Sequence, residues 1–208
     1  LHIGYSGFQI IQRAVNTFLK KEKNELTILD FGSGHGRVSR FLALAYAPEQ
    51  IWISDIKPDA VMFQKNHLGV NGFVSTASPM AFMQNQTFDL IFCGSLFTHL
   101  PERLYTQWLE ALSSWLNPGG ILVFSVHDIS ILGADPNQNG FYFHAANEDL
   151  LFPEIEGHLE DNQQYGITYS GESFIQKTVQ QLRNMTLIAK WEKEYGGKQD
   201  VYILQLEE

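Results

Sequence analysis

The chain has a single cysteine, Cys93, no long apolar segment, and no basic or apolar start. One cysteine excludes an internal disulfide and is typical of the reducing cytoplasm, which is the location we predict. The longest apolar runs, such as residues 121–126, fall far below the ~20 residues that cross a bilayer, so we expect no membrane span. Residues 1–7 have neither a basic start nor an apolar core, so we expect no signal peptide.

Basic residues are also scarce: 14 Lys and Arg stand against 23 Asp and Glu, which gives a net charge of −9. Because nucleic-acid affinity depends largely on Lys and Arg contacts with phosphate, we do not expect a nucleic-acid partner. Six carboxylates gather at residues 148–161 without a Lys or Arg among them, namely Glu148, Asp149, Glu154, Glu156, Glu160 and Asp161. We interpret them as a solvated loop face, with a rim that attracts a cationic substrate as the alternative.

The 208 residues, 44% of them hydrophobic, fit one α/β domain that spans residues 1–208. Over the first 126 residues the apolar pattern predicts strands at 26–31, 50–54, 72–76, 88–93 and 121–126. Helices are predicted at 7–21, 37–46, 58–68 and 101–116. Strands that alternate with helices of this length indicate βαβ units and a parallel sheet covered on both faces.

The pattern changes after residue 126. A helix is predicted at 172–182, followed by strands at 186–194 and 199–206 that form an antiparallel hairpin across Gly196 and Gly197. Gln199 and Asp200 are interpreted as polar residues of that hairpin. Residues 129–170 are polar and punctuated by Gly and Pro, and a connection of this length predicts a lid-like insertion. We expect the aromatic residues of this insertion to line an acceptor pocket or, alternatively, to form a small satellite core. These residues are Phe141, Tyr142, Phe143, Tyr165 and Tyr169.

Three glycines lie where the first predicted strand turns into a helix, in the sequence Asp30-Phe31-Gly32-Ser33-Gly34-His35-Gly36. Glycine at alternate positions lets the backbone adopt positive φ and lets a ligand approach without a Cβ clash. Asp55 ends the second predicted strand, and ligands of open α/β sheets bind outside the carboxyl ends of the strands. A carboxylate there can accept both hydroxyls of a ribose, so the loop and Asp55 together predict a bound adenosyl cofactor.

The glycine spacing distinguishes between two such cofactors. Dinucleotide-binding loops have the spacing G-x-G-x-x-G, which places a pyrophosphate on a helix N-terminus. Here the spacing is Gly32-x-Gly34-x-Gly36, and Asp30 precedes it. A carboxylate at that place is unfavourable for a pyrophosphate but suits the cationic amino group of a methionyl moiety. We therefore predict S-adenosylmethionine as the cofactor, with S-adenosylhomocysteine as its product.

Four segments resemble the class I S-adenosylmethionine-dependent methyltransferases in order and spacing: residues 29–37, 53–56, 88–100 and 116–122. The resemblance covers residues 26–126, and the tail at 165–167 and 197–201 is similar to a bacterial subgroup of generic methyltransferases. It implies a methyl-transferring enzyme with a Rossmann-like three-layer α/β/α sandwich. The implied sheet has seven mostly parallel strands, of which the last is antiparallel, in agreement with the predicted hairpin.

The resemblance also implies roles for single positions. Asp30 and the backbone of Gly32 and Gly34 would hold the methionyl end, and Asp55 would bind the ribose. The remaining implied cofactor-binding residues are Ser33, Gly36, which would allow close passage, Ile56, which would pack on the adenine, Cys93, Gly94 and Ser95. The family often places an acid after the third strand for the adenine amino group. This chain has Ala77 and Ser78 there, which would serve through the backbone or the hydroxyl.

Methyl transfer from a sulfonium centre needs mainly proximity and orientation, with a base added for a hydroxyl or amine acceptor. His99 and His127 follow the fourth and fifth strands and are the candidates for that base. Their alternative roles are structural, as a histidine that bonds the backbone before a helix and as a loop cap. His35 is interpreted as a helix-start or cofactor-shell residue, and Cys93 as packed rather than nucleophilic, since nothing nearby in sequence would stabilise a thiolate. No metal site is predicted.

The sequence therefore predicts a methyltransferase that acts on an O, N or C nucleophile of a small molecule. A nicotinamide-dependent oxidoreductase is the second hypothesis, which the glycine spacing and Asp30 oppose. The third is a domain that binds the cofactor without turning it over. The residues alone leave that hypothesis open, because catalysis of this kind depends on geometry.

Overall fold

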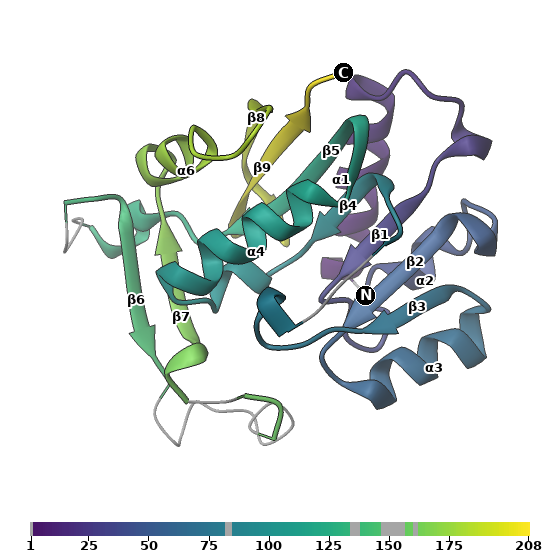
Figure 1. The fold of residues 1–208 in the computed structure, drawn as a ribbon, viewed down its shortest axis with the longest axis horizontal. Helices are drawn as coiled ribbons and strands as arrows, with labels where there is room; N and C mark the ends of the chain where they lie inside the picture. The colour runs from purple at the N-terminus through teal and green to yellow at the C-terminus, as the bar shows by residue number, and fades with distance from the viewer. Residues whose placement is uncertain (1, 82–84, 134–137, 147–156, 160–161) are drawn as a thin grey trace.

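The computed structural model describes residues 2–81, 85–133, 138–146, 157–159 and 162–208. Strands and helices alternate along the first part of the chain, as predicted (Figure 1). The strands are β1 (Ile28–Phe31), β2 (Ile51–Asp55), β3 (Asn71–Val74), β4 (Phe88–Cys93) and β5 (Leu116–Val126). The helices are α1 (His2–Phe18), α2 (Ser39–Leu42), α3 (Pro58–Leu68) and α4 (Glu102–Ser114). Helix α6 (Glu172–Val179) and strands β8 (Met185–Tyr195) and β9 (Gln199–Leu206) follow.

The main sheet of the described residues has seven strands in the order β3-β2-β1-β4-β5-β9-β8. Neighbouring strands from β3 to β5 are parallel, whereas β9 runs antiparallel to both β5 and β8. The predicted mostly parallel sheet with a C-terminal antiparallel hairpin is therefore confirmed. The strand order reverses between β1 and β4, which places the topological switch point, where ligands of open α/β sheets bind, at their carboxyl ends.

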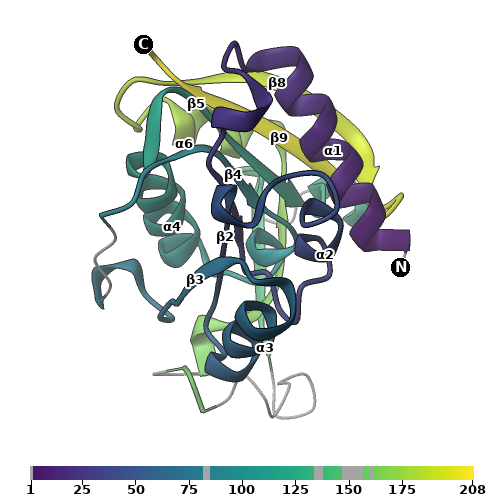
Figure 2. The same ribbon diagram turned by 90° about the vertical axis from the view of Figure 1, so that its right-hand side faces the viewer.

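Helices cover both faces of this sheet, which confirms the three-layer sandwich. Figure 2 shows α4 and α6 on one side of the strands and α1 and α2 on the other. Alternate residues of one strand supply the two hydrophobic layers, because successive side chains of a strand point to opposite faces. In β5, Leu122 and Phe124 pack with α4 and α6, whereas Ile121 and Val123 pack with α1 and α3. No helix of the described chain is long and apolar enough to cross a membrane.

Helix α1 begins at His2, five residues before the predicted start at residue 7. The predicted start was wrong: Gly4 stands in the missed turn, and a glycine weakens a helix by about 1 kcal/mol relative to Ala. In the structure Gly4 and Gly7 are both buried against the rest of the protein. A Cβ on Gly4 would collide with the carbonyl oxygen of Arg37, and one on Gly7 would lie 2.8 Å from Val38 Cγ2. Close packing of α1 therefore requires the glycine that made its start hard to predict.

Two other boundaries also differ from the prediction. The helix predicted at 37–46 is regular only over Ser39–Leu42 and continues as turns on either side. The helix predicted to reach residue 116 ends at Ser114, and β5 already begins at Leu116. The turn-forming residues 117–120 thus belong to the irregular start of a strand, where the register between β4 and β5 shifts.

The described part of the predicted insertion contains β6 (Phe141–Ala145) and β7 (Gly166–Ser170), which pair in a separate antiparallel sheet (Figure 1). The sequence analysis did not predict these strands. Two backbone hydrogen bonds join β7 to the main domain: Gly166 N donates to His99 O, and Ser170 N donates to His127 O, both over 2.9 Å. Whether residues 129–170 act as a lid stays a prediction, and the acidic residues at 148–161 that the sequence analysis singled out lie outside the described residues.

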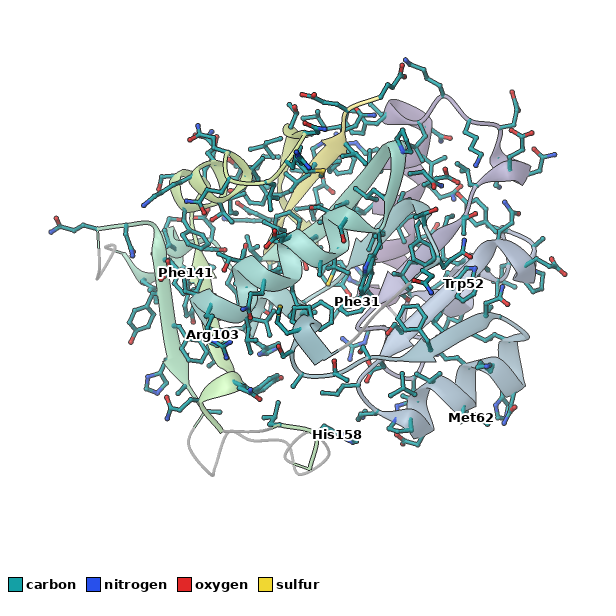
Figure 3. All side chains as sticks on the ribbon, in the orientation of Figure 1. Phe31, Trp52, Met62, Arg103, Phe141 and His158 are labelled. Atoms are coloured by element: carbon teal, nitrogen blue, oxygen red, sulfur yellow. The ribbon has the colours of Figure 1, made fainter. Side chains whose placement is uncertain are left out.

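The aromatic residues of this insertion do not share one role. Phe141 points from β6 back toward the main domain (Figure 3), where its ring lies 4.5 Å from Phe174 and 5.8 Å from Tyr105. It therefore extends the main core instead of forming a satellite core. Tyr142 contacts Tyr169 across the two strands, and Tyr165 lines a cavity at the carboxyl ends of β1, β2 and β4.

Candidate functional site

A cavity of about 800 Å³ opens at the carboxyl ends of β1, β2 and β4. Pockets that bind small ligands usually measure about 300–1,000 Å³. Most of the residues predicted for the site line it: Asp30, Gly32, Ser33, Gly34, Asp55, Ile56, Ala77, Gly94, Ser95 and His99. Gly36, Ser78, Cys93 and His127 lie outside its lining. The cavity therefore lies at the switch point, where the sequence placed the cofactor.

The glycine loop is bent over the end of β2. The N–H groups of Gly32 and Ser33 both donate to the carbonyl oxygen of Ser54, over 2.8 and 3.0 Å. Gly34 has a φ of +54°, and a Cβ built on it would have no heavy atom within 4 Å. Only glycine adopts this conformation without strain. The loop thus leaves open space on its cavity side, where a ligand can lie against the backbone.

Asp55 ends β2 with its carboxylate held in place by the backbone. One carboxylate oxygen accepts a hydrogen bond from Gly34 N over 2.7 Å, and the other accepts one from Lys57 N over 3.0 Å. An ionised carboxylate has about four acceptor positions, so the two backbone bonds leave others available to a ligand. Because the residue is buried and lines the cavity, these positions can accept hydroxyl groups inside the protein.

Asp30 lies deeper in the same wall and is only 2% exposed. Ser39 Oγ donates a hydrogen bond to its carboxylate over 2.6 Å. Burial raises the pKa of Asp30 to about 6 even though the bond from Ser39 lowers it, and the nearby charge of Asp55 raises it further. A positively charged ligand group in the cavity would favour the ionised form of this carboxyl group.

Gln64 supports the glycine loop and was not singled out from the sequence. Its buried amide Nε2 donates to Ser33 Oγ over 2.8 Å and to the carbonyl oxygen of Gly34 over 2.7 Å. A Cβ on Gly36 would lie 3.0 Å from Gln64 Oε1, so Gly36 provides space for Gln64, and its predicted role toward the cofactor stays a prediction. A polar residue among the buried positions of α3 is the sequence signal that could have identified it.

The region after β3 supplies backbone to the cavity. Ser75, Thr76 and Ala77 line it, and the carbonyl oxygen of Ala77 accepts a hydrogen bond from Trp108 Nε1 over 3.1 Å. Ser78 lies outside the lining, and its carbonyl oxygen accepts a bond from Thr76 Oγ1. Among the described residues that follow β3 and line the cavity, none has a carboxylate in place of the acid that the family often has here.

Ser95, after β4, is held by residues from two other strands. Its φ of +65° is rare for a residue other than glycine, and Ser125 Oγ accepts a hydrogen bond from its backbone N–H over 2.8 Å. Gln199, at the start of β9, accepts a hydrogen bond from Ser125 Oγ over 2.7 Å and lies 3.1 Å from Ser95 Oγ. Gln199 was interpreted as a polar hairpin residue, but here it joins the ends of β4 and β5 at the cavity.

Cys93 is fully buried beneath this network. Burial raises the pKa of its thiol well above the usual value, and the charge of Asp30 raises it further. The thiol therefore stays protonated, in agreement with its interpretation as a packed residue.

The ring of His99 is held at one of its two nitrogens. Its Nδ1 lies 2.9 Å from the carbonyl oxygen of Gly166, and its ring stacks on Tyr165 with centroids 4.7 Å apart. Because a carbonyl oxygen only accepts, Nδ1 carries the proton and Nε2 of the neutral ring keeps its lone pair. Burial lowers the pKa of His99, although the bond to Gly166 raises it. The ring is thus neutral near pH 7 and can accept a proton.

His127 ends β5 outside the cavity lining. Its carbonyl oxygen accepts a hydrogen bond from Ser170 N, and its ring lies 5.6 Å from that of Tyr169. Burial lowers its pKa, and the neighbouring His99 lowers it further. Of the two predicted bases, only His99 lines the cavity.

Several residues that the sequence analysis did not propose for the site also line the cavity, among them Phe31, Arg37, Arg40, Trp108 and Tyr195. Phe31, at the end of β1 (Figure 3), packs on Trp108 of α4, with ring centroids 4.9 Å apart. Tyr195 comes from the end of β8, more than 150 positions from the glycine loop, and nothing in its local sequence marks it. Among the described residues, no group of three or more His, Cys, Asp or Glu is arranged to hold a metal ion.

A family model described as a methyltransferase domain matches residues 5–181, which is most of the chain. The chain belongs to this methyltransferase family. The matched residues include the glycine loop, Asp55 and His99, and end before β8. The resemblance read from the sequence is therefore confirmed. A comparison with curated proteins gives no match.

Solved structures of methyltransferases share this fold over almost their whole length. The CcbJ methyltransferase of Streptomyces caelestis has a TM-score of 0.67 at 13% identity, covering 100% of this chain and 91% of that one. An S-adenosylmethionine-dependent methyltransferase of Clostridium acetobutylicum has a TM-score of 0.63 at 16% identity, covering 100% and 93%. The magnesium protoporphyrin IX methyltransferase of Synechocystis, solved with bound S-adenosylhomocysteine, has a TM-score of 0.62 at 15% identity, covering 99% and 86%. At these identities the likeness shows the fold of this methyltransferase and nothing further.

Proposed function

We propose that this methyltransferase binds S-adenosylmethionine in the cavity and transfers its methyl group to an O, N or C nucleophile of a small molecule. One observation supports this above others. The glycine loop and Asp55 lie at one part of a single cavity, and a neutral histidine, His99, lines another. The groups that would bind the cofactor and a proton acceptor thus line the same cavity.

The residues present fit an adenosyl cofactor. The open space at Gly34 can take a ligand against the backbone, and the fixed carboxylate of Asp55 can accept the hydroxyls of a ribose. Ile56, beside Asp55 in the lining, offers an apolar contact for the adenine. The carbonyl oxygen of Ala77 accepts one hydrogen bond from Trp108 and keeps a second lone pair, so the backbone of Ala77 can still serve the adenine.

When bound, the cofactor supplies a methyl carbon on a positively charged sulfur, which leaves with the bonding electron pair. The protein has to orient the acceptor and, for a hydroxyl or amine, remove its proton. We assign proton removal to Nε2 of His99, since its Nδ1 is already bound to Gly166. His127 lies outside the lining, and we keep it as a second candidate for the base.

We further propose that residues 1–208 form one domain in which the segment at 129–170 covers the acceptor side of the cavity. Leu159, Gln164 and Tyr165 of that segment line the cavity, and Tyr165 stacks on His99. The net charge of −9 favours a small-molecule acceptor over a nucleic acid. The single buried cysteine favours a cytoplasmic location.

Calorimetry with S-adenosylmethionine, S-adenosylhomocysteine and NAD tests the proposed cofactor. We expect micromolar or tighter binding of both sulfur compounds and little response to NAD. Heat from NAD alone would favour the oxidoreductase hypothesis and refute this one. A screen of metabolites for acceptor-dependent formation of S-adenosylhomocysteine then distinguishes an enzyme from a domain that only binds the cofactor.

A further inference from the structure

The proposed base, His99, is stacked on an aromatic ring of the insertion. The ring of Tyr165 lies 4.7 Å from that of His99, centroid to centroid, with only 12° between the two planes. Both side chains belong to the lining of the cavity, so the two rings meet face to face in its wall. The face of an aromatic ring is its negative part, and here the imidazole lies over that face.

The backbone on both sides of Tyr165 holds its ring in this place. Gly166, the next residue, donates its N–H to the carbonyl oxygen of His99 and accepts a hydrogen bond from His99 Nδ1, both over 2.9 Å. The carbonyl oxygen of Tyr165 accepts a hydrogen bond from Ala146 N, also over 2.9 Å. Strand β6 packs closely here, because a Cβ on Gly166 would collide with the carbonyl oxygen of His144. The position of Tyr165 relative to His99 is thus fixed from two sides.

The charge of His99 changes when it acts as a base. In the proposed reaction the acceptor gives its proton to Nε2 and its lone pair to the methyl carbon, while the methyl–sulfur bonding pair stays on sulfur. His99 then becomes an imidazolium, because Nδ1 keeps the proton that it donates to Gly166. A cation over the face of an aromatic ring, within about 6 Å of its centroid, is attracted by that ring. The stack on Tyr165 therefore becomes stronger as the proton moves, and only interactions that strengthen in this way accelerate the reaction.

A neighbouring titratable group, His127, opposes the charged form of His99. His127 ends β5, and the charge of His99 lowers its pKa, so the two rings disfavour each other's positive charge. Burial raises the pKa of Tyr165 to about 12, which keeps its ring uncharged near pH 7. The His99 ring is hydrogen-bonded to a carbonyl oxygen and not to a carboxylate. The charged form of His99 therefore depends on the carbonyl oxygen of Gly166 and on the face of the Tyr165 ring.

We propose that Tyr165 is a positioning residue for methyl transfer, which holds the ring of His99 and stabilises the imidazolium that forms as the acceptor loses its proton. Tyr165 acts through His99 and takes no proton itself. With the carbonyl oxygen of Gly166, it fills the role that a buried aspartate has in a Ser-His-Asp triad, where it orients the histidine and stabilises its charged form. This inference rests on the proposed function, because it assigns a partner to the proposed base.

The pKa of His99 in the ligand-free protein tests this role. ¹⁵N NMR of protein with labelled histidine gives the pKa, and the signal that is absent from His99→Gln identifies the residue. Tyr165→Leu removes the aromatic face and should lower the pKa of His99 by about 0.4 to 1.5, which is the contribution of a cation–π contact. A substitution that only opened the site to water would raise the pKa instead, because burial is what lowers it in the wild type.

Two matched variants separate the ring of Tyr165 from its hydroxyl and from its neighbours. Tyr165→Phe keeps the ring and should keep the wild-type pKa of His99. Tyr169→Leu removes a half-buried ring of β7 that contacts Tyr142 and His127, and it should also leave the pKa of His99 unchanged. A thermal unfolding curve of each variant establishes that it is folded at the temperature of the titration.

The same variants give a kinetic readout. With a hydroxyl or amine acceptor from the metabolite screen, Tyr165→Leu should lower kcat about 2- to 30-fold, because it loses the cation–π contact in the transition state. Tyr165→Phe should restore the wild-type kcat. Equal kcat values for the wild type and Tyr165→Leu would overturn the part of Tyr165 in methyl transfer.

The outcomes separate this inference from the proposed function. A pKa of His99 that is unchanged or raised in Tyr165→Leu overturns the role of Tyr165, whatever the protein binds. The role is also wrong if Tyr165→Phe behaves like Tyr165→Leu, since the hydroxyl and not the ring would then act on His99. A protein that binds neither S-adenosylmethionine nor S-adenosylhomocysteine refutes the proposed function instead, while the pKa values still decide whether Tyr165 stabilises the charged form of His99.

Discussion

Replacing Asp30 by Asn should stabilise the ligand-free protein and weaken its binding of the cofactor. The carboxyl group is only 2% exposed, and burial raises its pKa from 3.8 to about 6. Each pKa unit corresponds to about 1.4 kcal/mol, so ionised Asp30 costs the folded state about 3 kcal/mol near neutral pH. Asn keeps an oxygen that can accept the hydrogen bond from Ser39 and carries no charge. The free energy of unfolding at pH 8 should therefore rise by up to about 3 kcal/mol.

The pH dependence of this effect follows from the direction of the pKa shift. The folded state binds the proton of Asp30 more tightly than the unfolded chain, so the wild-type protein loses stability as pH rises from about 4 to about 6. The advantage of Asp30→Asn should be full above pH 7 and shrink as pH falls toward 4. Urea denaturation of both proteins at several pH values measures it.

A matched buried carboxylate gives the opposite expectation. Asp89 is 6% exposed, but it accepts hydrogen bonds from Lys21 Nζ, Thr27 N and Asn117 Nδ2, at 2.8 to 2.9 Å. Asp89→Asn should therefore lower the free energy of unfolding by about 1–3 kcal/mol. If Asp30→Asn destabilises the protein at pH 8 as Asp89→Asn does, the reasoning about the unpaired buried charge is refuted. An unchanged affinity of Asp30→Asn for S-adenosylhomocysteine would instead mean that Asp30 does not act on the cofactor.

Three more substitutions test other parts of the site and fold. Asp55→Ala should weaken S-adenosylhomocysteine binding about 100- to 10,000-fold, because each of two lost charged hydrogen bonds contributes about 1.5–3 kcal/mol. Asp59→Asn, on the exposed side of α3, should leave the affinity unchanged. If calorimetry gives Asp55→Ala the affinity of the wild type, the ribose partner is another residue. His99→Gln should slow transfer to a hydroxyl acceptor about 100- to 10,000-fold. The initial rate of the wild type should rise with pH through a pKa below 6.5, and this rise should be absent from the mutant. A mutant with the wild-type pH–rate profile would exclude His99 as the base. Gly4→Ala should lower the free energy of unfolding by about 1–3 kcal/mol, because the added Cβ would collide with the Arg37 carbonyl oxygen. Thermal denaturation measures this loss. A loss as small as that of Gln9→Ala, at an exposed position of the same helix, would contradict the packing described for α1.

Much of the cofactor side of the site could be predicted because its signals are local. The glycine loop and Asp55 each stand directly after a buried apolar strand, and the carboxyl ends of neighbouring parallel strands lie at one edge of the sheet. The structure brings both to one cavity, as the sequence indicated. Their roles toward a ligand stay predictions until binding is measured.

The remaining parts of the site could not be predicted because contacts between distant segments create them. Tyr195 reaches the cavity from the end of β8, and Gln199 reaches Ser95 from the start of β9. Within their own segments both look like ordinary hairpin residues. The start of α1 was missed for a related reason, since the burial of Gly4 outweighs the low helix propensity of glycine.

The strand order of the sheet has a consequence for synthesis of the chain. Strand β9 leaves the ribosome after the other six strands, yet it lies between β5 and β8. Until it is made, β5 and β8 each present an unpaired edge, which is a template for association with other chains. Gln199, at the start of β9, also completes the contacts that hold Ser95. A nascent chain that stops before β9 therefore has neither a closed sheet nor a finished site, so we expect such intermediates to depend on chaperones.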